Sequence, residues 1–119
     1  MRIAVPCTDG QLCLHFGLCD HFAIFETDFD SRKIISARMI LAPPHLPGVV
    51  PRWLTDQDIQ VVISAGMGEK AQNIFYQNNI EVLLGAPIDT PERLVEDFLT
   101  GSLIPGDNAC TKIGAMYHC

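Results

Sequence analysis

Four potential metal ligands lie within nine residues of one another near the start of the chain. The segment 13–21 reads CLHFGLCDH, so Cys13, His15, Cys19 and His21 form two Cys-x-His pairs. Thiolate and imidazole are ligands that soft and borderline metal ions prefer. In an extended chain, residues two apart point to the same side, so each pair could face one metal centre. The spacing therefore predicts a metal or metal–sulfur site on a loop.

Packing is the alternative role for each of these cysteines, because free cysteine is among the most buried residue types. The chain has five cysteines and four histidines, and seven of these nine residues fall in segments 13–21 and 110–119. This clustering favours metal binding over packing. In the second segment, Cys110, His118 and Cys119 are either a further set of metal ligands or part of an exposed, disordered end.

Composition limits the class of protein. With 119 residues, 48% hydrophobic and 18% charged, the chain suits a single globular domain. Its formal net charge of −6 disfavours binding to nucleic acid. No apolar run approaches the roughly 20 residues of a membrane span, and the start lacks a signal-peptide pattern. We therefore expect a cytoplasmic location, with reduced thiols.

Hydrophobic periodicity predicts an α/β fold with a mixed sheet of about five strands flanked by helices. Strands are expected at 2–5, where Pro6 should end the first, and at 21–27, 33–41, 60–64 and 80–84. The second and third should form an antiparallel hairpin. Helices are expected at 49–54, around 71–78 and from 91 to 100, the last with Thr90 as its N-cap and Gly101 just past its end. The domain should cover 1–108, followed by a tail at 109–119.

Three motifs in this order resemble a known family: HFG at 15–17, His-x-x-Gly at 45–48 and GMGEKA at 66–71. The chain is similar, from residue 1 to about 108, to the dinitrogenase iron–molybdenum cofactor biosynthesis domain family, which includes cofactor carriers and a molybdenum–copper-binding orange protein. The resemblance implies a ribonuclease-H-like fold. It also implies binding or delivery of an anionic metal–sulfur cluster containing iron, molybdenum or copper, with a cofactor-assembly or acceptor protein as partner. Family members usually lack cysteines at Cys7, Cys13 and Cys19, and often have arginine where Lys70 stands.

A candidate cluster site surrounds the glycine turn. Gly66 and Gly68 follow a predicted strand and precede a helix, and a helix N-terminus offers free N–H groups that suit an anion. Gly17 allows close approach of the backbone to a ligand. His45, in a proline-rich loop, and Lys70 complete the candidate set of cofactor-binding residues. A tight turn without a ligand, an exposed histidine and a solvated lysine are the corresponding structural alternatives.

Other classes of function are less well supported. A two-metal nuclease needs clustered carboxylates at strand ends, and the segment 2–5 carries none. A Cys–His nucleophile would need a third, orienting group, and none is evident, so we do not expect an enzyme. Two alternatives to a cluster-binding protein stay open. One is a redox or regulatory thiol module in which Cys13, Cys19 or Cys110 form reversible disulfides, and the other is an interaction domain without a ligand.

Overall fold

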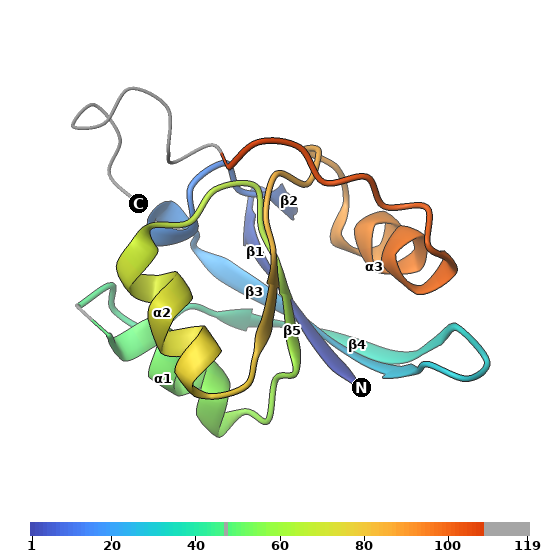
Figure 1. Cartoon of the computed structure of the whole chain (residues 1–119), viewed down its shortest axis with the longest axis horizontal. Coiled ribbons are helices and arrows are strands. Elements are labelled where there is room, and N and C mark those ends of the chain that lie inside the picture. Colours follow the sequence, from blue (N-terminus) through green and yellow to red (C-terminus); the bar gives the residue numbers. More distant parts are fainter. Residues whose placement is uncertain (47, 109–119) are drawn as a thin grey trace.

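The computed structural model describes residues 1–46 and 48–108 (Figure 1). Within them, one sheet is combined with three α-helices and a short 3₁₀ turn, η1, at Phe16–Leu18. The strands are β1 (Arg2–Thr8), β2 (Gln11–Leu12), β3 (His21–Asp28), β4 (Lys33–Leu41), β5 (Val61–Ile63) and β6 (Glu81–Leu83). The α-helices are α1 (Val49–Asp56), α2 (Glu69–Gln77) and α3 (Pro91–Thr100).

The sheet is mixed, as the sequence predicts. Its strand order is β4-β3-β1-β5-β6, and β2 pairs only with β1. β3 is antiparallel to β1 and to β4, whereas β5 is parallel to both β1 and β6. The antiparallel half comes from the hairpin at the start of the chain, and the parallel half from strands joined through helices. The predicted α/β class is therefore confirmed.

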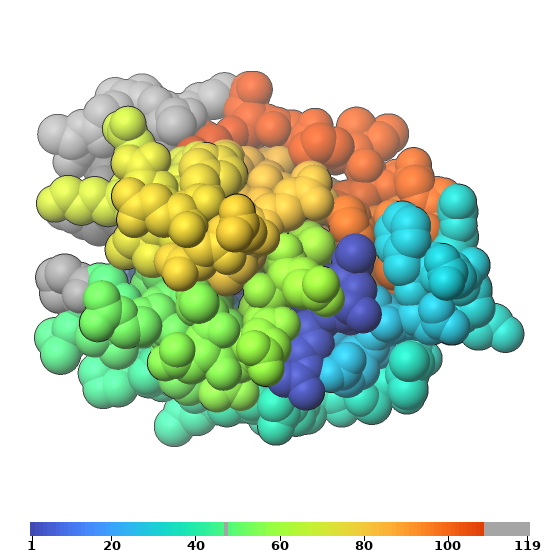
Figure 2. Space-filling view, turned by 60° about the horizontal axis from the view of Figure 1, so that its bottom comes forward, coloured from blue at the N-terminus to red at the C-terminus, as the bar shows by residue number. Residues whose placement is uncertain are grey.

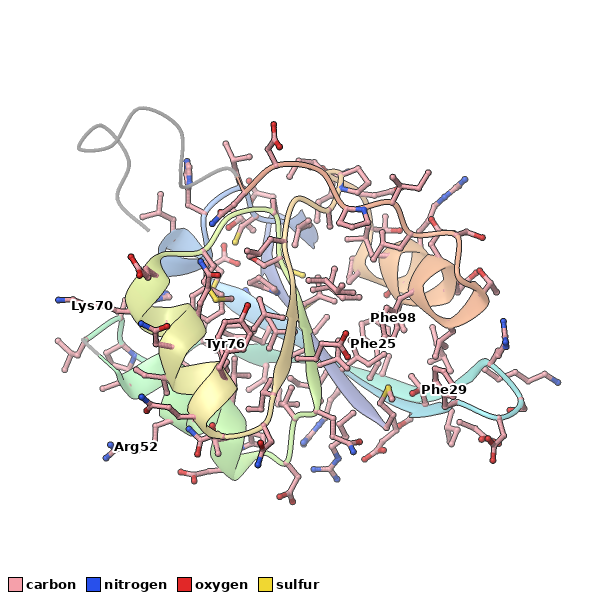
Figure 3. The ribbon with its side chains drawn as sticks, in the orientation of Figure 1. Phe25, Phe29, Arg52, Lys70, Tyr76 and Phe98 are labelled. Atoms are coloured by element: carbon pink, nitrogen blue, oxygen red, sulfur yellow. The ribbon has the colours of Figure 1, made fainter. Side chains whose placement is uncertain are left out.

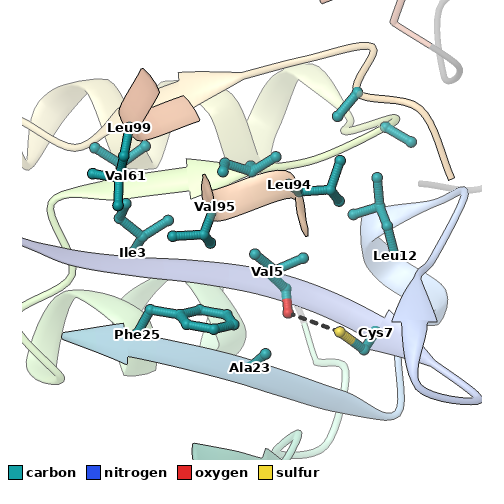
Figure 4. Packing of buried hydrophobic residues seen from close by; sticks show 13 residues of the cluster. Ile3, Val5, Cys7, Leu12, Ala23, Phe25, Val61, Leu94, Val95 and Leu99 are labelled. Atoms are coloured by element: carbon teal, nitrogen blue, oxygen red, sulfur yellow. Dashed lines mark hydrogen bonds between the residues drawn. The ribbon is translucent and has the colours of Figure 1, made fainter. Parts of the chain in front are cut away.

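Helices cover both faces of the sheet. α1 and α2 lie side by side on one face, green and yellow in Figure 2, and α3 lies on the other (Figure 1). Under α3, the side chains of Leu94, Val95 and Leu99 pack on Ile3 and neighbouring strand residues (Figure 4). Burial of these apolar faces is the main force that holds the layers together. None of the helices in the described part of the chain is long and apolar enough to cross a bilayer.

The prediction that the first strand ends before Pro6 is wrong, because β1 runs through it to Thr8. β5 pairs with β1 only at Ile3 and Ala4. Proline is normally excluded from central strands because it cannot donate a ladder hydrogen bond. Beyond Ala4, however, no β5 residue pairs with β1, so no β5 residue needs an N–H group from Pro6. The carbonyl of Pro6 still accepts a bond from the N–H of Cys13, 3.0 Å away, so the strand remains tied on that side.

The chain after α3 folds back across the carboxyl ends of β5 and β6. The N–H of Gly106 donates to the carbonyl of Gly85 at 2.7 Å. Gly85 has a φ of +73°, and a Cβ there would collide with the carbonyl of Gly106, so both the conformation and the close approach require glycine. Two residues later, Asn108 donates to and accepts from the backbone of Met67, at 2.9 Å each. The end of the described chain therefore holds the turn between β5 and α2.

Candidate functional site

A cavity of about 830 Å³ opens where η1, the loop before α1 and the first turn of α2 meet. Four of the five predicted cofactor-binding residues line it: Gly17, His45, Gly68 and Lys70. They come from three segments that are far apart in the sequence. The structure therefore brings together residues that the motifs indicated only one at a time.

The fifth residue, Gly66, lies outside the cavity lining and supports it. Its carbonyl accepts a hydrogen bond from the N–H of Phe16 at 2.8 Å. This bond ties η1, which carries Gly17, to the turn that carries Gly68. The two glycine-containing walls of the cavity are thus fixed relative to each other.

Gly68 is the N-cap residue of α2. Its φ of −70° and ψ of 157° are open to any residue, so backbone strain does not explain a glycine here. Among the described residues, no side chain caps the N–H groups of this first helical turn. These N–H groups and the helix dipole favour an anion, and a glycine leaves room for one beside the cavity.

The remaining walls are mainly apolar, with one cation at the rim. Phe16 is buried, whereas Leu18 and Leu46 are 64% and 62% exposed at the mouth. Lys70 is exposed and extends away from the body of the protein at the start of α2 (Figure 3). Its neighbour Glu69 also lines the cavity and offsets part of its charge. The cavity thus combines apolar contact with a small number of anion-attracting groups.

Two cysteines from the predicted ligand loop are buried beside this cavity. Cys13 and Cys19 are 6% and 3% exposed and belong to the same buried cluster. The Sγ of Cys13 donates a hydrogen bond to the carbonyl of His15 at 3.2 Å. The neighbouring Cys19 thiol lowers the pKa of Cys13 by stabilising its thiolate, whereas its interaction with Cys13 and burial raise the pKa of Cys19.

His45 connects this pair to the cavity. Its Nε2 lies 2.7 Å from the carbonyl oxygen of Cys19 and 4.0 Å from the Sγ of the same residue. A carbonyl can only accept, so Nε2 carries a proton and donates. The sequence indicated His45 as a cofactor ligand but gave no sign of this contact, because the partners are 26 residues apart.

The side chain of His21 bonds to a neighbouring carboxylate. His21 lies 2.9 Å through Nδ1 from a carboxylate oxygen of Asp20, and it lines a separate cavity of about 290 Å³ with Cys7 and Met39. His15 is half-buried and precedes η1. Across residues 1–46 and 48–108, no three or more His, Cys, Asp or Glu side chains converge as a metal-ion site would require. Cys110, His118 and Cys119 lie outside the described residues.

Cys7 is buried in the α3 face of the sheet, away from the other two thiols. Its Sγ donates to the carbonyl of Val5 at 3.3 Å, the dashed line in Figure 4. Burial raises the pKa of this thiol to about 11. Its surroundings are those of a packing residue, the role that buried cysteine commonly has.

Comparisons with known proteins agree with this architecture. The model of the dinitrogenase iron–molybdenum cofactor family matches residues 1–101. An uncharacterized protein of Methanocaldococcus jannaschii is 26% identical over 87% of this chain and 89% of its own length. The crystal structure of PH0822 superposes with a TM-score of 0.84 at 22% identity, covering 94% of this chain and all of that one. The apo orange protein of Desulfovibrio gigas gives 0.70 at 20% identity, covering 90% and 93%. These two structures show the shared fold.

Proposed function

Because the chain belongs to the dinitrogenase iron–molybdenum cofactor family, we propose that it binds an anionic metal–sulfur cluster in the cavity beside α2. We further propose that it holds this cluster for transfer to a partner in cofactor assembly. One observation carries the proposal: Gly17, His45, Gly68 and Lys70 line a single cavity.

Charge supports an anion as the ligand. The uncapped N–H groups at the start of α2 and the ammonium of Lys70 both attract negative charge. The imidazole of His45, whose Nε2 already donates to Cys19, stands at the same wall. These local donors act at short range, so the overall charge of −6 does not prevent anion binding.

The apolar walls support a sulfide-rich anion rather than phosphate or a free oxyanion. Phe16, Leu18 and Leu46 would face the ligand, and burial of a strongly hydrated oxyanion against such surfaces is costly. A cluster with a sulfide surface is larger, softer and less strongly hydrated than an oxyanion, so it loses less hydration free energy when it enters the cavity. The cavity of about 830 Å³ has room for a compact cluster.

A carrier fits the site better than a catalyst. Among its described lining residues the cavity has one carboxylate, Glu69, whereas two-metal hydrolysis relies on several. The exposed leucines at the mouth, Leu18 and Leu46, give an acceptor protein an apolar rim to contact. We therefore propose binding and delivery, without chemistry on the ligand.

The test is elemental analysis with a visible absorption spectrum on protein purified without oxygen. The proposal predicts metal and inorganic sulfide in fixed proportion to the chain, together with visible bands. The bands and the sulfide should both be lost from a Gly68→Val variant. A colourless protein that takes up no cluster on reconstitution would refute the proposal.

A regulatory thiol module is a second candidate, supported by the burial of Cys13 and Cys19 in one cluster, where each thiol shifts the pKa of the other. A disulfide between Cys13 and Cys19 would cross-link the two ends of the loop that carries Gly17. Both thiols are nearly inaccessible, which slows attack by an oxidant. This candidate predicts that a mild disulfide oxidant removes two titratable thiols from the chain and leaves it colourless.

A further inference from the structure

β4 leaves one margin of the sheet open. It is the outermost strand in the order β4-β3-β1-β5-β6 (Figure 1), and within residues 1–46 and 48–108 it pairs with β3 alone. In an antiparallel ladder, the N–H and carbonyl groups of alternate residues point away from the paired strand. The register with β3 is regular from Ser36 to Leu41, and the irregularity at Glu26 and Thr27 lies beyond that stretch. This regular stretch offers a template on which another strand can add.

An apolar row of side chains accompanies the open edge. Met39 pairs with Ala23 of β3, which belongs to the cluster under α3. Because paired residues point to the same face and strand side chains alternate, Ala37, Met39 and Leu41 lie together on that face. α3 does not shield this row, since Met39 and Leu41 are 49% and 70% exposed. A strand added beside β4 would therefore cover apolar side chains that now face water.

Charge identifies the kind of strand that fits. Residues 31–55 hold four of the eight Lys and Arg of the chain and none of its 14 Asp and Glu. Arg38 of β4 lies on the face opposite the apolar row, across from Ile24 of β3. It forms no ion pair within the part of the chain that the structure describes. Lys33 instead lies across from Asp28, which offsets its charge. Arg38 can therefore accept a carboxylate from outside.

We propose that β4 binds an extended segment of a partner protein by strand addition, and that this segment alternates apolar and acidic residues. Its apolar side chains would pack on the row formed by Ala37, Met39 and Leu41, and a carboxylate on its other face would pair with Arg38. Main-chain hydrogen bonds to the outward groups of β4 would give affinity, and the alternating side chains would give specificity. No residue of β4 lines the cluster cavity, so the site goes beyond the function proposed above.

A second copy of this chain fits the same edge less well. The charged side chains of β4, Lys33 and Arg38, are both cations, and like charges on neighbouring strands are destabilising. Antiparallel pairing of two copies centred on Ala37 would place the two Arg38 side chains at diagonal positions on one face. Each chain also carries a net charge of −6, which opposes association of copies. The charge of β4 therefore disfavours self-association and admits an acidic strand.

The experiment measures binding of two labelled peptides to the full chain, without any cluster, by fluorescence anisotropy. The probe is a capped heptapeptide that alternates valine and glutamate, and the control peptide has lysine in place of each glutamate. The glutamate peptide should bind saturably, and the lysine peptide should bind roughly tenfold more weakly or not at all. Arg38→Glu should weaken binding of the glutamate peptide roughly tenfold. Arg52→Glu, the same charge change on α1, should keep the affinity within about threefold. Absence of saturable binding, equal binding of the two peptides, or equal effects of the two substitutions would overturn the proposal.

Amide hydrogen exchange provides a readout that does not depend on whether the variants fold. In the wild type, the glutamate peptide should slow exchange at alternate residues from Ser36 to Leu41, the outward set. N-methylation of one alternate set of peptide amides should abolish binding, whereas methylation of the other set should not, because one set faces β4. Protection at β6 or around the cluster cavity in place of β4 would overturn the proposal. A dimer that forms without peptide and protects β4 would also overturn it, in favour of a second copy.

The same measurements separate this site from the cluster cavity. Tetrathiomolybdate, an anionic molybdenum sulfide, is the probe for the cavity and should leave the affinity for the glutamate peptide unchanged. If tetrathiomolybdate fails to bind but the peptide binds at β4, the proposed function fails and the strand-addition site stands. The reverse result rejects the strand-addition site alone.

Discussion

The Nε2 of His45 donates a hydrogen bond to the carbonyl oxygen of Cys19 at 2.7 Å. This bond ties the proline-rich loop before α1 to the loop that carries the cysteine pair. One imidazole thus lines the proposed cluster-binding cavity and stabilises the wall behind it. The same His45 ring therefore donates a hydrogen bond within the fold and forms part of the cavity surface.

Replacement of His45 should therefore destabilise the fold as well as the cavity. His45→Ala leaves the carbonyl of Cys19 without this donor, which should cost about 1 kcal/mol in the free energy of unfolding. His21→Ala is the matched control, because the His21 ring bonds to the adjacent Asp20 in a partly exposed pair. Urea denaturation measures both, and equal losses in the two variants would contradict the assigned role of His45.

Charge at the rim can be tested with two exposed cations, Lys70 and Arg52, both labelled in Figure 3. Lys70 lines the cavity and Arg52, on α1, does not. Lys70→Gln should weaken tetrathiomolybdate binding roughly threefold at low ionic strength and less at high salt, because an exposed charge is screened. Arg52→Gln should have little effect. Equal effects of the two substitutions would mean that only the overall charge matters.

The buried thiol of Cys7 should make stability depend on pH in the alkaline range. Its pKa is near 9.0 in an unfolded chain and about 11 in the native state, so the native state retains a proton that the unfolded state loses. This contribution is fully present below pH 9 and disappears as pH rises to 11, by about 2 kcal/mol in total. The pH profile of unfolding free energy should therefore be flatter in Cys7→Ala, and parallel profiles would disprove the assignment.

The end of the described chain should matter for the turn before α2. A chain that stops after Asn108 keeps the two hydrogen bonds to Met67, whereas one that stops after Gly106 loses them. From the structure we expect the free energy of unfolding of the shorter chain to be about 1–2 kcal/mol lower than that of the longer one. Identical thermal denaturation curves would show that Asn108 does not support the turn.

Local patterns in the sequence were sufficient to predict most elements of the fold. β4 begins and ends at the predicted residues, and α3 begins after Thr90 and ends before Gly101. Such elements depend on periodicity and end signals that lie within a few residues. The continuation of β1 through Pro6 depends instead on where the pairing between β1 and β5 ends. Residues 55 or more positions apart determine that point, so a local sequence pattern does not reveal it.

The candidate site was predictable as a set of residues but not as an arrangement. The motifs singled out Gly17, His45, Gly68 and Lys70, and all four line one cavity. The spacing of the Cys-x-His pairs suggested that each cysteine would face the histidine two residues later. The structure instead buries Cys13 and Cys19 in one cluster, with η1 turning the chain between them.

The most direct test of the central claim is a tetrathiomolybdate titration of the wild-type chain and Gly68→Val. The backbone at Gly68 accepts any residue, so valine should leave the melting temperature nearly unchanged while filling space at the anion-binding turn. The account predicts saturable binding by the wild type, at least a tenfold weaker affinity in Gly68→Val, and wild-type affinity in Ser102→Val, an exposed control outside the cavity. Equal affinity of Gly68→Val and wild type, or no saturable binding by the wild type, would contradict it.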